Sequence, residues 1–436
     1  MYDVIIIGAG IAGLNTARLL NNNNRKICIL EKTNRIGGMI HSKFINITKK
    51  NKHNSKAKKN KTLKNKSSKK KVKFETGGAV VYSYQKNMTQ LIDKFNIDVF
   101  KLPVDKNGKH RKDFWDDNTN KPLSKSQQNK YYSILKKLFR YMDKKGTSYC
   151  NKFTFEQIAL QIISLDDIRF IEFCYGYSCE IRVTNSVLAR TNIENELFNS
   201  KNILIFKKGY NQLTNAIYNS IKNDIKLIKN CTVNKFKKYN NYYKVYTNKS
   251  SFKTKKLIFA IPKESLEKLC NSFTSHELRL FNNVQGCSLN RVFAQYDMSK
   301  KQNQWMKKLN FTTINNPIRQ IIPLRKKLGL FQISYSDWYF ADFWGNLSKN
   351  DTKIVLNKLL KDTFHRTIDD PIKIWKYYWK DGTHAWNPNT DYKKLYKKIL
   401  HLRKNLFIVG ESFSLIQGWC SGSVQTSIDV AKIINK

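Results

Sequence analysis

The chain opens with an apolar run that stops at closely spaced glycines. Residues 4–7 are all β-branched, and three glycines follow at once, Gly8, Gly10 and Gly13. A short apolar run bounded by glycine is typical of a buried parallel strand. Residues 14–20 then have apolar side chains at helical spacing, and a second apolar run, 27–30, ends at Glu31. The pattern predicts a strand, a helix and a second strand.

This order is that of a dinucleotide-binding motif. The first glycine makes a tight turn, the second lets the backbone approach a pyrophosphate, and the third lets the helix pack on the strand. An acid at the end of the second strand accepts the ribose hydroxyls. We therefore predict an α/β, Rossmann-like fold whose dinucleotide contacts Gly8, Gly10, Ala12, Gly13 and Glu31.

The residues after Glu31 indicate which dinucleotide is bound. They are Lys32, Arg35 and a second glycine pair followed by methionine, Gly37, Gly38 and Met39. The pattern E-x-x-x-R-x-G-G resembles the FAD-binding start of the flavin amine oxidase superfamily, which includes monoamine and polyamine oxidases, protoporphyrinogen oxidase and carotenoid desaturases. The resemblance implies FAD as the cofactor, with Arg35 within reach of its pyrophosphate.

Three later segments resemble the same family. Residues 74–79 look like its strand beside the flavin and contain Gly77, Gly78 and Ala79. Residues 209–213 look like its helix start, and in the strand that follows the backbone of Val233 would contact adenine. The apolar strand 405–411 ends in Gly410 and Glu411, whose carboxylate is expected at the ribityl or phosphate region of FAD.

Residues 418–424 are predicted to open a terminal helix, whose N-terminus would face the anionic N1–C2=O edge of the flavin. The family order Gly-aromatic-x-x-Gly-x-Val implies that Trp419 lies in front of the flavin and that the Val424 amide lies at its O2. Gly418 and Ser423 are expected to bind the cofactor as well. A core position for Trp419 is the alternative, since most tryptophans are buried. No cysteine occupies the flavin-linking position, so the resemblance implies non-covalent FAD.

One departure from the family concerns the mechanism. Amine oxidases of this family usually carry a lysine that holds a water at flavin N5, and the best match here is Arg291. Arginine keeps the positive charge but is bulkier, forked and always protonated. We expect Arg291 and Trp419 to act at the reacting centre; the alternative for Arg291 is an exposed surface position.

The segments between the cofactor-binding motifs predict a substrate domain. Helical periodicity is found at 88–95, 131–142 and 155–165, and strands are expected at 257–262, 288–296, 330–334 and 374–379. Trp375, Tyr377 and Trp379 share one face of the last strand, either as a wall of the substrate cavity or packed on the core. His384 lies in a glycine-containing loop that matches the family loop beside the flavin, in a structural or a catalytic role.

The predicted fold is therefore a Rossmann-like (GR2-type) FAD-binding domain with a second, α+β substrate domain built on a mixed sheet. We assign residues 1–82, 203–262 and 396–436 to the FAD-binding domain. Residues 83–202 and 263–395 are assigned to the substrate-binding domain.

Charge modifies this prediction in one segment. The formal net charge is +48, with 80 Lys+Arg against 32 Asp+Glu. Much of it follows from a composition rich in Lys, Asn and Ile, as in an AT-rich genome such as that of a giant virus or protist. Residues 49–73 hold many lysines and no acid, and are predicted to be a disordered insertion. The insertion is either a solvated loop or a contact for nucleic acid or another anionic surface.

The eight cysteines are scattered without metal-ligand spacing, so they are expected to be reduced and no metal site is predicted. No apolar run is long enough to span a membrane, and no signal peptide is expected. A reducing, cytoplasmic location is therefore expected, with the nucleus or a virion as alternatives.

Three functions remain open. The first is oxidation of an amine by hydride transfer to flavin N5, with oxygen or another acceptor reoxidising the flavin. The second is oxidation of C–C or ring bonds, as in protoporphyrinogen oxidase or desaturases, which an apolar cavity would favour. The third is a basic nucleic-acid or virion-associated protein that keeps the flavin fold as a scaffold.

Overall fold

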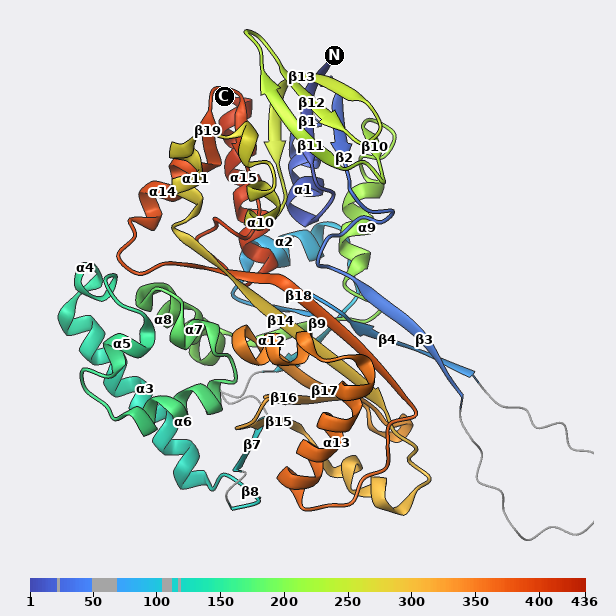
Figure 1. The fold of residues 1–436 in the computed structure, drawn as a ribbon, viewed down its shortest axis with the longest axis vertical. Helices are drawn as coiled ribbons and strands as arrows, with labels where there is room; N and C mark the ends of the chain where they lie inside the picture. Colours follow the sequence, from blue (N-terminus) through green and yellow to red (C-terminus); the bar gives the residue numbers. More distant parts are fainter. Residues whose placement is uncertain (22–23, 49–68, 104–111, 117–118) are drawn as a thin grey trace, which may run out of the picture.

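The computed structural model describes residues 1–21, 24–48, 69–103, 112–116 and 119–436. Two large sheets lie at opposite ends of the molecule, and both chain termini lie beside the same one of them (Figure 1). A layer of helices flanks the other sheet (Figure 1).

The first sheet has eight strands drawn from distant parts of the chain. β1 (Tyr2–Ile7) pairs in parallel with β2 (Ile27–Leu30) and with β13 (Ser251–Phe259), and β13 pairs in parallel with β20 (Leu406–Ile408). The other members are β10 (Lys226–Ile228), β11 (Val233–Lys238), β12 (Tyr243–Thr247) and β19 (His401–Arg403). The predicted strands at both ends of the chain are confirmed, and they form one sheet.

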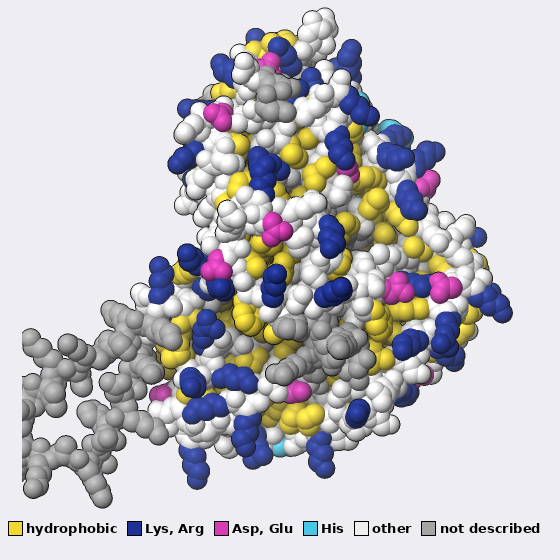
Figure 2. Space-filling view, turned by 180° about the vertical axis from the view of Figure 1, so that it is seen from behind, with side chains coloured by type: hydrophobic (Ala, Val, Ile, Leu, Met, Phe, Trp, Pro, Cys, Tyr) yellow, Lys and Arg dark blue, Asp and Glu magenta, His cyan; other side chains and the backbone are white. Residues whose placement is uncertain are grey.

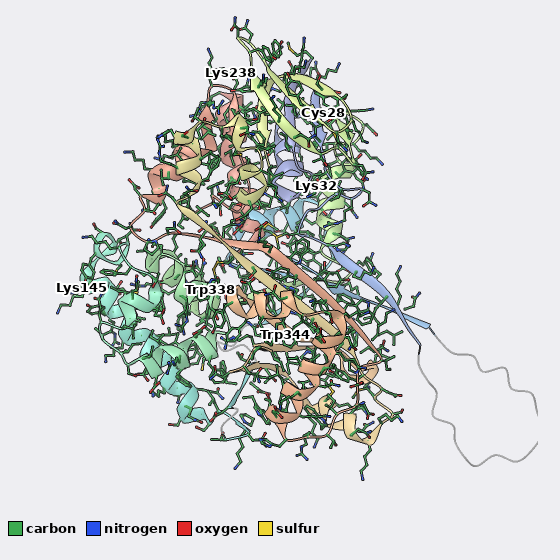
Figure 3. All side chains as sticks on the ribbon, viewed as in Figure 1. Cys28, Lys32, Lys145, Lys238, Trp338 and Trp344 are labelled. Atoms are coloured by element: carbon green, nitrogen blue, oxygen red, sulfur yellow. A yellow bond between two sulfur atoms is a disulfide. The ribbon has the colours of Figure 1, made fainter. Side chains whose placement is uncertain are left out.

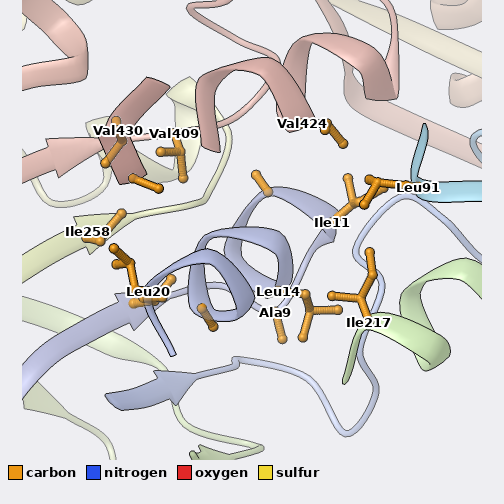
Figure 4. Close-up of a cluster of buried hydrophobic side chains, with 14 of the residues drawn as sticks. Ala9, Ile11, Leu14, Leu20, Leu91, Ile217, Ile258, Val409, Val424 and Val430 are labelled. Carbon is orange, nitrogen blue, oxygen red and sulfur yellow. The ribbon is translucent and has the colours of Figure 1, made fainter. Parts of the chain in front are cut away.

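Helices bury their apolar faces against this sheet. They are α1 (Ile11–Leu20), α2 (Lys86–Lys94), α9 (Asn211–Asn219) and α15 (Cys420–Asn435). In Figure 4, Ile11, Leu14 and Leu20 of α1 lie among side chains from these elements, including Leu91, Ile217, Val424 and Val430. α1 comes this close because position 13 is glycine: a Cβ there would lie 2.1 Å from the carbonyl oxygen of Gly8. The packing role predicted for Gly13 is confirmed.

The second sheet has seven strands and is mixed, as predicted. Its order is β18 (Lys373–Trp386), β14 (Val284–Gln295), β17 (Leu330–Asp337), β16 (Gln320–Arg325), β15 (Phe311–Ile314), β7 (Lys112–Asp116) and β8 (Lys121–Pro122). The β15–β7 pair is parallel and the other pairs are antiparallel. α12 (Trp338–Asn346) and α13 (Lys349–Phe364) pack on this sheet, and Trp344 is completely buried between them and the strands (Figure 3).

The helical layer comprises α3 (Lys125–Lys145), α4 (Thr147–Cys150), α5 (Phe155–Ala159), α6 (Leu165–Tyr175), α7 (Cys179–Arg182), α8 (Ser186–Glu194) and the π-helical turn η1 (Asn195–Asn199). The helices predicted at 88–95 and 131–142 are confirmed within α2 and α3. The single helix predicted over 155–165 is wrong. α5 ends at Ala159, and Ser164 caps a new helix by accepting a hydrogen bond from the Asp167 amide at 3.1 Å.

Smaller elements connect the two sheets. They are a hairpin of β3 (Ser42–Thr48) and β4 (Lys69–Glu75), a three-stranded sheet of β5 (Val80–Tyr82), β9 (Asn202–Phe206) and β6 (Val99–Pro103), and the helices α10 (Lys263–Glu267), α11 (Ser275–Phe281) and α14 (Tyr392–Leu400). Short 3₁₀ turns complete the chain at Cys270–Ser272, Lys301–Lys308 and Lys326–Leu328.

The disorder predicted over 49–73 is wrong for the last five of these residues. Residues 49–68 lie outside the described part of the chain, but residues 69–73 belong to β4. The prediction of disorder fails there because Val72 alternates with Phe74 on one face of the strand. Both side chains are buried against Phe293 in a small core.

Two cysteines also depart from the prediction. Cys179 of α7 and Cys287 of β14 form a disulfide, while the other six cysteines are free. The expectation that all eight are reduced is therefore wrong for this pair. Sequence spacing gave no signal, since 108 positions separate the two residues and only the fold brings their Cα atoms to 6.7 Å.

Basic side chains are spread over the face seen in Figure 2, with few acidic ones between them. Across the described ranges, no helix has the length and apolarity needed to span a membrane. The same residues contain no group of three or more His, Cys, Asp or Glu side chains that could hold a metal ion.

Candidate active site

A cavity of about 1500 Å³ extends from the turns after β1 and β2 to the helical layer. Most of the predicted cofactor residues line it: Gly8, Gly10, Ala12, Glu31, Lys32, Arg35, Gly37, Gly38, Met39, Gly77, Gly78, Ala79, Val233, Gly410, Glu411, Gly418 and Ser423. Gly13 and Val424 instead lie in the core behind this lining. Segments from both ends of the chain thus meet at one cavity, as the FAD resemblance requires.

The glycines form a cradle that a dinucleotide can enter. Gly8 has φ +105°, and a Cβ there would lie 2.5 Å from the carbonyl oxygen of Ala260. Gly10 differs, since the only atom within 4 Å of a Cβ there is the Cα of Gly38, at 3.9 Å. The protein itself therefore leaves room beside Gly10. Arg35 also lines the cavity, and its guanidinium donates a hydrogen bond to the Gly38 carbonyl oxygen at 2.7 Å.

The N-termini of two helices, α1 and α15, lie at the cavity wall. α1 and α15 both lack acidic residues in their first turns, and neither N-cap side chain binds the helix amides. Uncapped N-terminal amides and the helix dipole favour a pyrophosphate or the anionic edge of a flavin. The donor set and the space beside Gly10 therefore fit FAD.

The two predicted glutamates are already held by the protein. Glu31 accepts hydrogen bonds from the Ala9 amide and the Thr33 amide, each at 2.8 Å, which fixes its carboxylate beside the first glycine turn. Glu411 accepts from the Gly418 amide at 2.6 Å and from the His384 amide at 3.1 Å. Both carboxylates lie at the cavity wall, and their contacts with FAD remain predictions.

His384 forms the centre of a buried ionic network. Its Nδ1 lies 2.6 Å from Glu411 Oε2 and its Nε2 lies 3.0 Å from Glu264 Oε2, while Ser412 Oγ lies 3.2 Å away. Burial alone would lower the pKa of His384, but the charge of Glu411 and the hydrogen bonds to both glutamates raise that pKa to about 10. The imidazole is therefore a cation at neutral pH, and the network favours the structural role left open for His384.

Arg291 lies on β14 and is only 5% exposed, so the surface alternative is wrong. Its Nη1 donates to the Glu75 carbonyl oxygen and to Gln332 Oε1, both at 3.4 Å, and its guanidinium lies 4.3 Å from the centre of the Tyr335 ring. Arg291 Nε and Gln332 Nε2 are buried without a hydrogen-bond partner among the described residues. Both residues line the cavity, which places an unsatisfied pair of donors at its wall.

Trp419 also lines the cavity, so the core alternative for it is wrong. Its indole meets the Tyr82 ring edge to face, with centroids 5.1 Å apart. Trp379 lies on the same wall and donates from its indole nitrogen to the Thr76 carbonyl oxygen at 2.8 Å. The cavity-wall alternative for the aromatic face of this strand therefore holds for Trp379, whereas Tyr82 was missed because its position depends on how the two sheets meet.

The substrate-wall assignment of Trp375 and Tyr377 is wrong. Both rings pack behind the cavity lining, against Phe74, with centroid distances of 5.6 Å and 6.2 Å. Phe74 and Phe293 line the cavity in their place. The core alternative was the correct one, because β4 of the hairpin covers this face of β18.

Acidic residues from the helical layer and from β17 face the cavity as well. Glu180, Glu196 and Asp337 line it, and none of them was expected from the sequence. Asp337 accepts from the Ser178 and Cys179 amides at 2.9 Å and 2.8 Å, yet burial raises its pKa to about 6. Burial and the neighbouring charges of Asp337 and Glu196 also hold the pKa of Glu180 well above its usual range. This wall is therefore an acidic region inside a strongly basic protein.

Comparison with known proteins agrees with the assignment of this cavity to FAD. Residues 11–435 match the model of the family described as flavin containing amine oxidoreductase. Solved structures of putrescine oxidase, one of them with bound putrescine, share the fold over 100% of this chain and 99% of theirs, at 12% identity and TM-scores of 0.74 and 0.75.

Two curated relatives match locally. UDP-galactopyranose mutase of Mycoplasma genitalium is 43% identical over 42 residues, which are 10% of this chain and 10% of the mutase. Amine oxidase A of Equus caballus is 29% identical over 105 residues, which are 24% of this chain and 15% of the oxidase. These alignments therefore span only a small part of either relative.

Proposed function

Because the chain belongs to the flavin-containing amine oxidoreductase family, we propose that it is an FAD-dependent enzyme that oxidises an amine. FAD, when bound, supplies the hydride acceptor for the carbon next to the substrate nitrogen. The resulting imine is hydrolysed by water, and oxygen or another acceptor takes up the electrons. The putrescine bound in a structural relative is an amine, which agrees with this class of substrate.

The observation that carries the proposal is the character of the cavity beyond the glycine turns. Its lining there includes Tyr82, Tyr175, Tyr177 and Tyr335 together with Glu180. Aromatic faces attract a cationic or neutral amine. The Glu180 carboxyl, whose raised pKa favours its neutral form, can accept a hydrogen bond from an N–H group of the amine. Oxidation of a C–C or ring bond would use the apolar part of the lining, which includes Leu102, Ile203 and Ile322, so it is the tyrosines that favour the amine. The scaffold hypothesis finds no support, since the cofactor glycines and both glutamates lie at one cavity.

The protein's own residues position the substrate and exclude water. Trp419 and Tyr82, at right angles to each other, present aromatic surfaces at the point where the substrate carbon would meet the flavin. Arg291 faces the same space and can hold a water through its unpartnered Nε. No residue needs to act as a nucleophile, because the cofactor accepts the hydride.

We further propose that FAD is held without a covalent bond. Cys420 is the free cysteine on the cavity wall nearest to Trp419, and burial raises its pKa to about 11. A protonated thiol is a poor nucleophile. Trichloroacetic acid should therefore release all the yellow colour from the purified protein into the supernatant. A coloured pellet would contradict non-covalent binding.

The function itself is tested with the purified protein. Its visible spectrum should show bound flavin, and a panel of primary and secondary amines, added without oxygen, should bleach that spectrum. A colourless native protein that cannot be reconstituted with FAD would refute the flavin assignment. A yellow protein that every amine leaves oxidised would refute amine oxidation alone.

A further inference from the structure

Three strands of the first sheet carry an outer face that amine oxidation does not use. β11 pairs with β12, and β12 pairs with β13, both in antiparallel fashion, at the end of the molecule farthest from the second sheet (Figure 1). Successive side chains of a strand point to opposite faces. Phe236, Tyr243 and Val245 point inward and are buried in the core. The side chains that alternate with them therefore point to solvent.

These outward positions carry lysines and tyrosines. We define them as the lysine–tyrosine face, which consists of Lys235, Lys237, Tyr239, Tyr242, Lys244, Tyr246 and Lys253. No acidic residue occurs in the chain between Asp224 and Glu264. Within the part of the chain that the structure describes, none of the four lysines of this face forms an ion pair, whereas Lys255 beside them pairs with Asp3 at 2.8 Å. The face therefore has positive charge that no carboxylate compensates.

Three of the lysines form one row across the strands. Lys237 lies opposite Lys244, and Lys244 lies opposite Lys253 on the next strand. Like charges directly opposite each other destabilise a sheet. Because neighbouring strands are about 4.8 Å apart, the row holds three cations within about 10 Å. A chain of phosphates lying across the three strands would remove this repulsion.

The tyrosine rings lie among these cations. Lys244 Nζ is 5.0 Å from the centre of the Tyr246 ring, and Lys253 Nζ is 5.1 Å from that of Tyr242. The rings of Tyr239 and Tyr242 stack, with centroids 5.0 Å apart and planes 9° from parallel, and the hydroxyls of Tyr239 and Tyr246 are 3.3 Å apart. Unpaired nucleic-acid bases stack on aromatic rings of this kind while neighbouring basic side chains contact the phosphates.

We propose that the lysine–tyrosine face binds single-stranded nucleic acid. The row of three lysines contacts successive phosphates, and bases stack on the exposed tyrosine rings. A duplex fits this face less well, since its paired bases present only their edges. A lipid surface also fits less well, because apolar side chains of these strands such as Phe236 and Val245 are buried and leave little aliphatic surface to enter lipid.

This binding is separate from the amine oxidation proposed above. The seven residues of the lysine–tyrosine face are absent from the described lining of the cavity. Failure of one proposal therefore leaves the other standing, and the flavin reports whether a variant of the face is folded.

The test measures the binding of a fluorescein-labelled single-stranded RNA of about 15 nucleotides to the whole chain with its flavin, by fluorescence anisotropy at several salt concentrations. The triple variant Lys237→Gln, Lys244→Gln and Lys253→Gln should raise the Kd by about tenfold or more. Its plot of log Kd against log salt concentration should be shallower by about 2, since each phosphate contact contributes about 0.7. Its flavin content should equal that of the wild-type protein.

A matched variant controls for the general charge of this basic protein. Lys136→Gln, Lys144→Gln and Lys145→Gln together remove the same charge from exposed positions of α3. This variant should change the Kd by less than about twofold, because only the overall field is weakened.

A second variant tests the role of the rings. Tyr239→Leu together with Tyr242→Leu keeps every charge and removes two stacking surfaces. It should weaken RNA binding by about tenfold. Binding of inorganic polyphosphate, which has no bases, should stay unchanged when measured by isothermal titration calorimetry.

Each other outcome would overturn the proposal. Equal losses in the two triple lysine variants would show that RNA responds only to net charge. Unchanged RNA binding in the tyrosine variant would reduce the face to a site for simple anions. Tighter binding to phosphatidylserine vesicles than to RNA, lost in the Lys237, Lys244 and Lys253 variant, would assign the face to a membrane surface. Loss of RNA binding in both variants of the face, but not in the α3 variant, is the result we expect.

Discussion

Gly10 and Gly13 belong to one motif but have different structural roles. A Cβ at Gly13 collides with the Gly8 carbonyl oxygen, whereas a Cβ at Gly10 meets only the Gly38 Cα at an ordinary contact distance. Gly13 thus serves the packing of the protein, and Gly10 leaves space for the cofactor. The motif predicts these separate roles, and the structure gives the distances that distinguish them.

Gly10→Ala should therefore lower the flavin content of the purified protein while its thermal midpoint without flavin stays close to that of the wild-type apoprotein. Gly13→Ala is the matched variant and should destabilise the fold by about 1–3 kcal/mol, because backbone must move. Glu31→Gln should reduce flavin retention less than Gly10→Ala, since an amide oxygen can still accept hydrogen bonds. Full flavin content in Gly10→Ala would show that the pyrophosphate lies elsewhere.

Arg291→Lys tests how the cation at the reacting centre affects the two half-reactions. The bulky guanidinium is held over Tyr335, so a compact ammonium at this position leaves more space for an ordered water and for oxygen. We expect the variant to be reoxidised by oxygen about tenfold faster, with a smaller change in flavin reduction.

Arg319→Lys provides the control for this substitution, because Arg319, immediately before β16, is also buried but is absent from the cavity lining. Stopped-flow traces of each half-reaction distinguish the outcomes. If Arg291→Lys instead abolished substrate binding and left reoxidation unchanged, Arg291 would be a carboxylate anchor, and an amino acid would be the better substrate.

The helices and strands predicted best are those whose own pattern of apolar residues determines which of their faces are buried. The run at 4–7 is buried on both faces of the sheet, so its apolar character alone identifies β1. The prediction of one helix over 155–165 was wrong because the apolar pattern is continuous across two helices. The break between them depends on a single cap at Ser164. Strand β4 was missed because its lysines dominate the composition while only Val72 and Phe74 determine its burial.

The hairpin gives a prediction about the Lys-rich segment. Removing Asn51–Ser68 spares every described residue of β3 and β4, so folding and flavin binding should be unchanged. Removing Asn51–Lys71 also deletes Lys70 and Lys71, which pair with Ile47 and Asn46. This longer deletion should lower thermal stability, because Ile47 and Val72 form part of a buried cluster.

Thermal melting and flavin content of the two deletion proteins check this difference. Loss of FAD in the shorter deletion would show that the segment contacts the cofactor site. If the segment binds nucleic acid, the shorter deletion should weaken that binding and make it less sensitive to salt.

At the level of the molecule, the cofactor half of the site was predictable and the substrate half was not. The first glycine turn carries its chemistry in the spacing of a local motif, and the residues of the second glycine pair and of the final helix were implied by the family resemblance. Glu180, Glu196 and Asp337 come from separate elements and share no motif. Only the packing of the helical layer against β17 brings them to one cavity wall. The disulfide between Cys179 and Cys287 joins the same two parts.

The His384 network joins the two large sheets, so its ionisation should affect the stability of the whole molecule. His384 lies on β18, while Glu264 and Glu411 follow β13 and β20 of the other sheet. The folded-state pKa of about 10 exceeds the unfolded value of about 6.5. The stabilisation from His384 is therefore complete below pH 6.5 and is lost progressively as the pH rises from 6.5 to 10.

The measurement is the urea midpoint of unfolding between pH 5 and pH 10.5. The wild-type protein should lose stability over this interval more steeply than His384→Gln, which has no imidazolium to lose, and the two curves should converge near pH 10. His276→Gln, which changes an exposed histidine of α11, should follow the wild-type curve. Parallel curves for wild type and His384→Gln would show that the imidazole is neutral in the folded protein. In that case the network would not hold the two sheets together by charge.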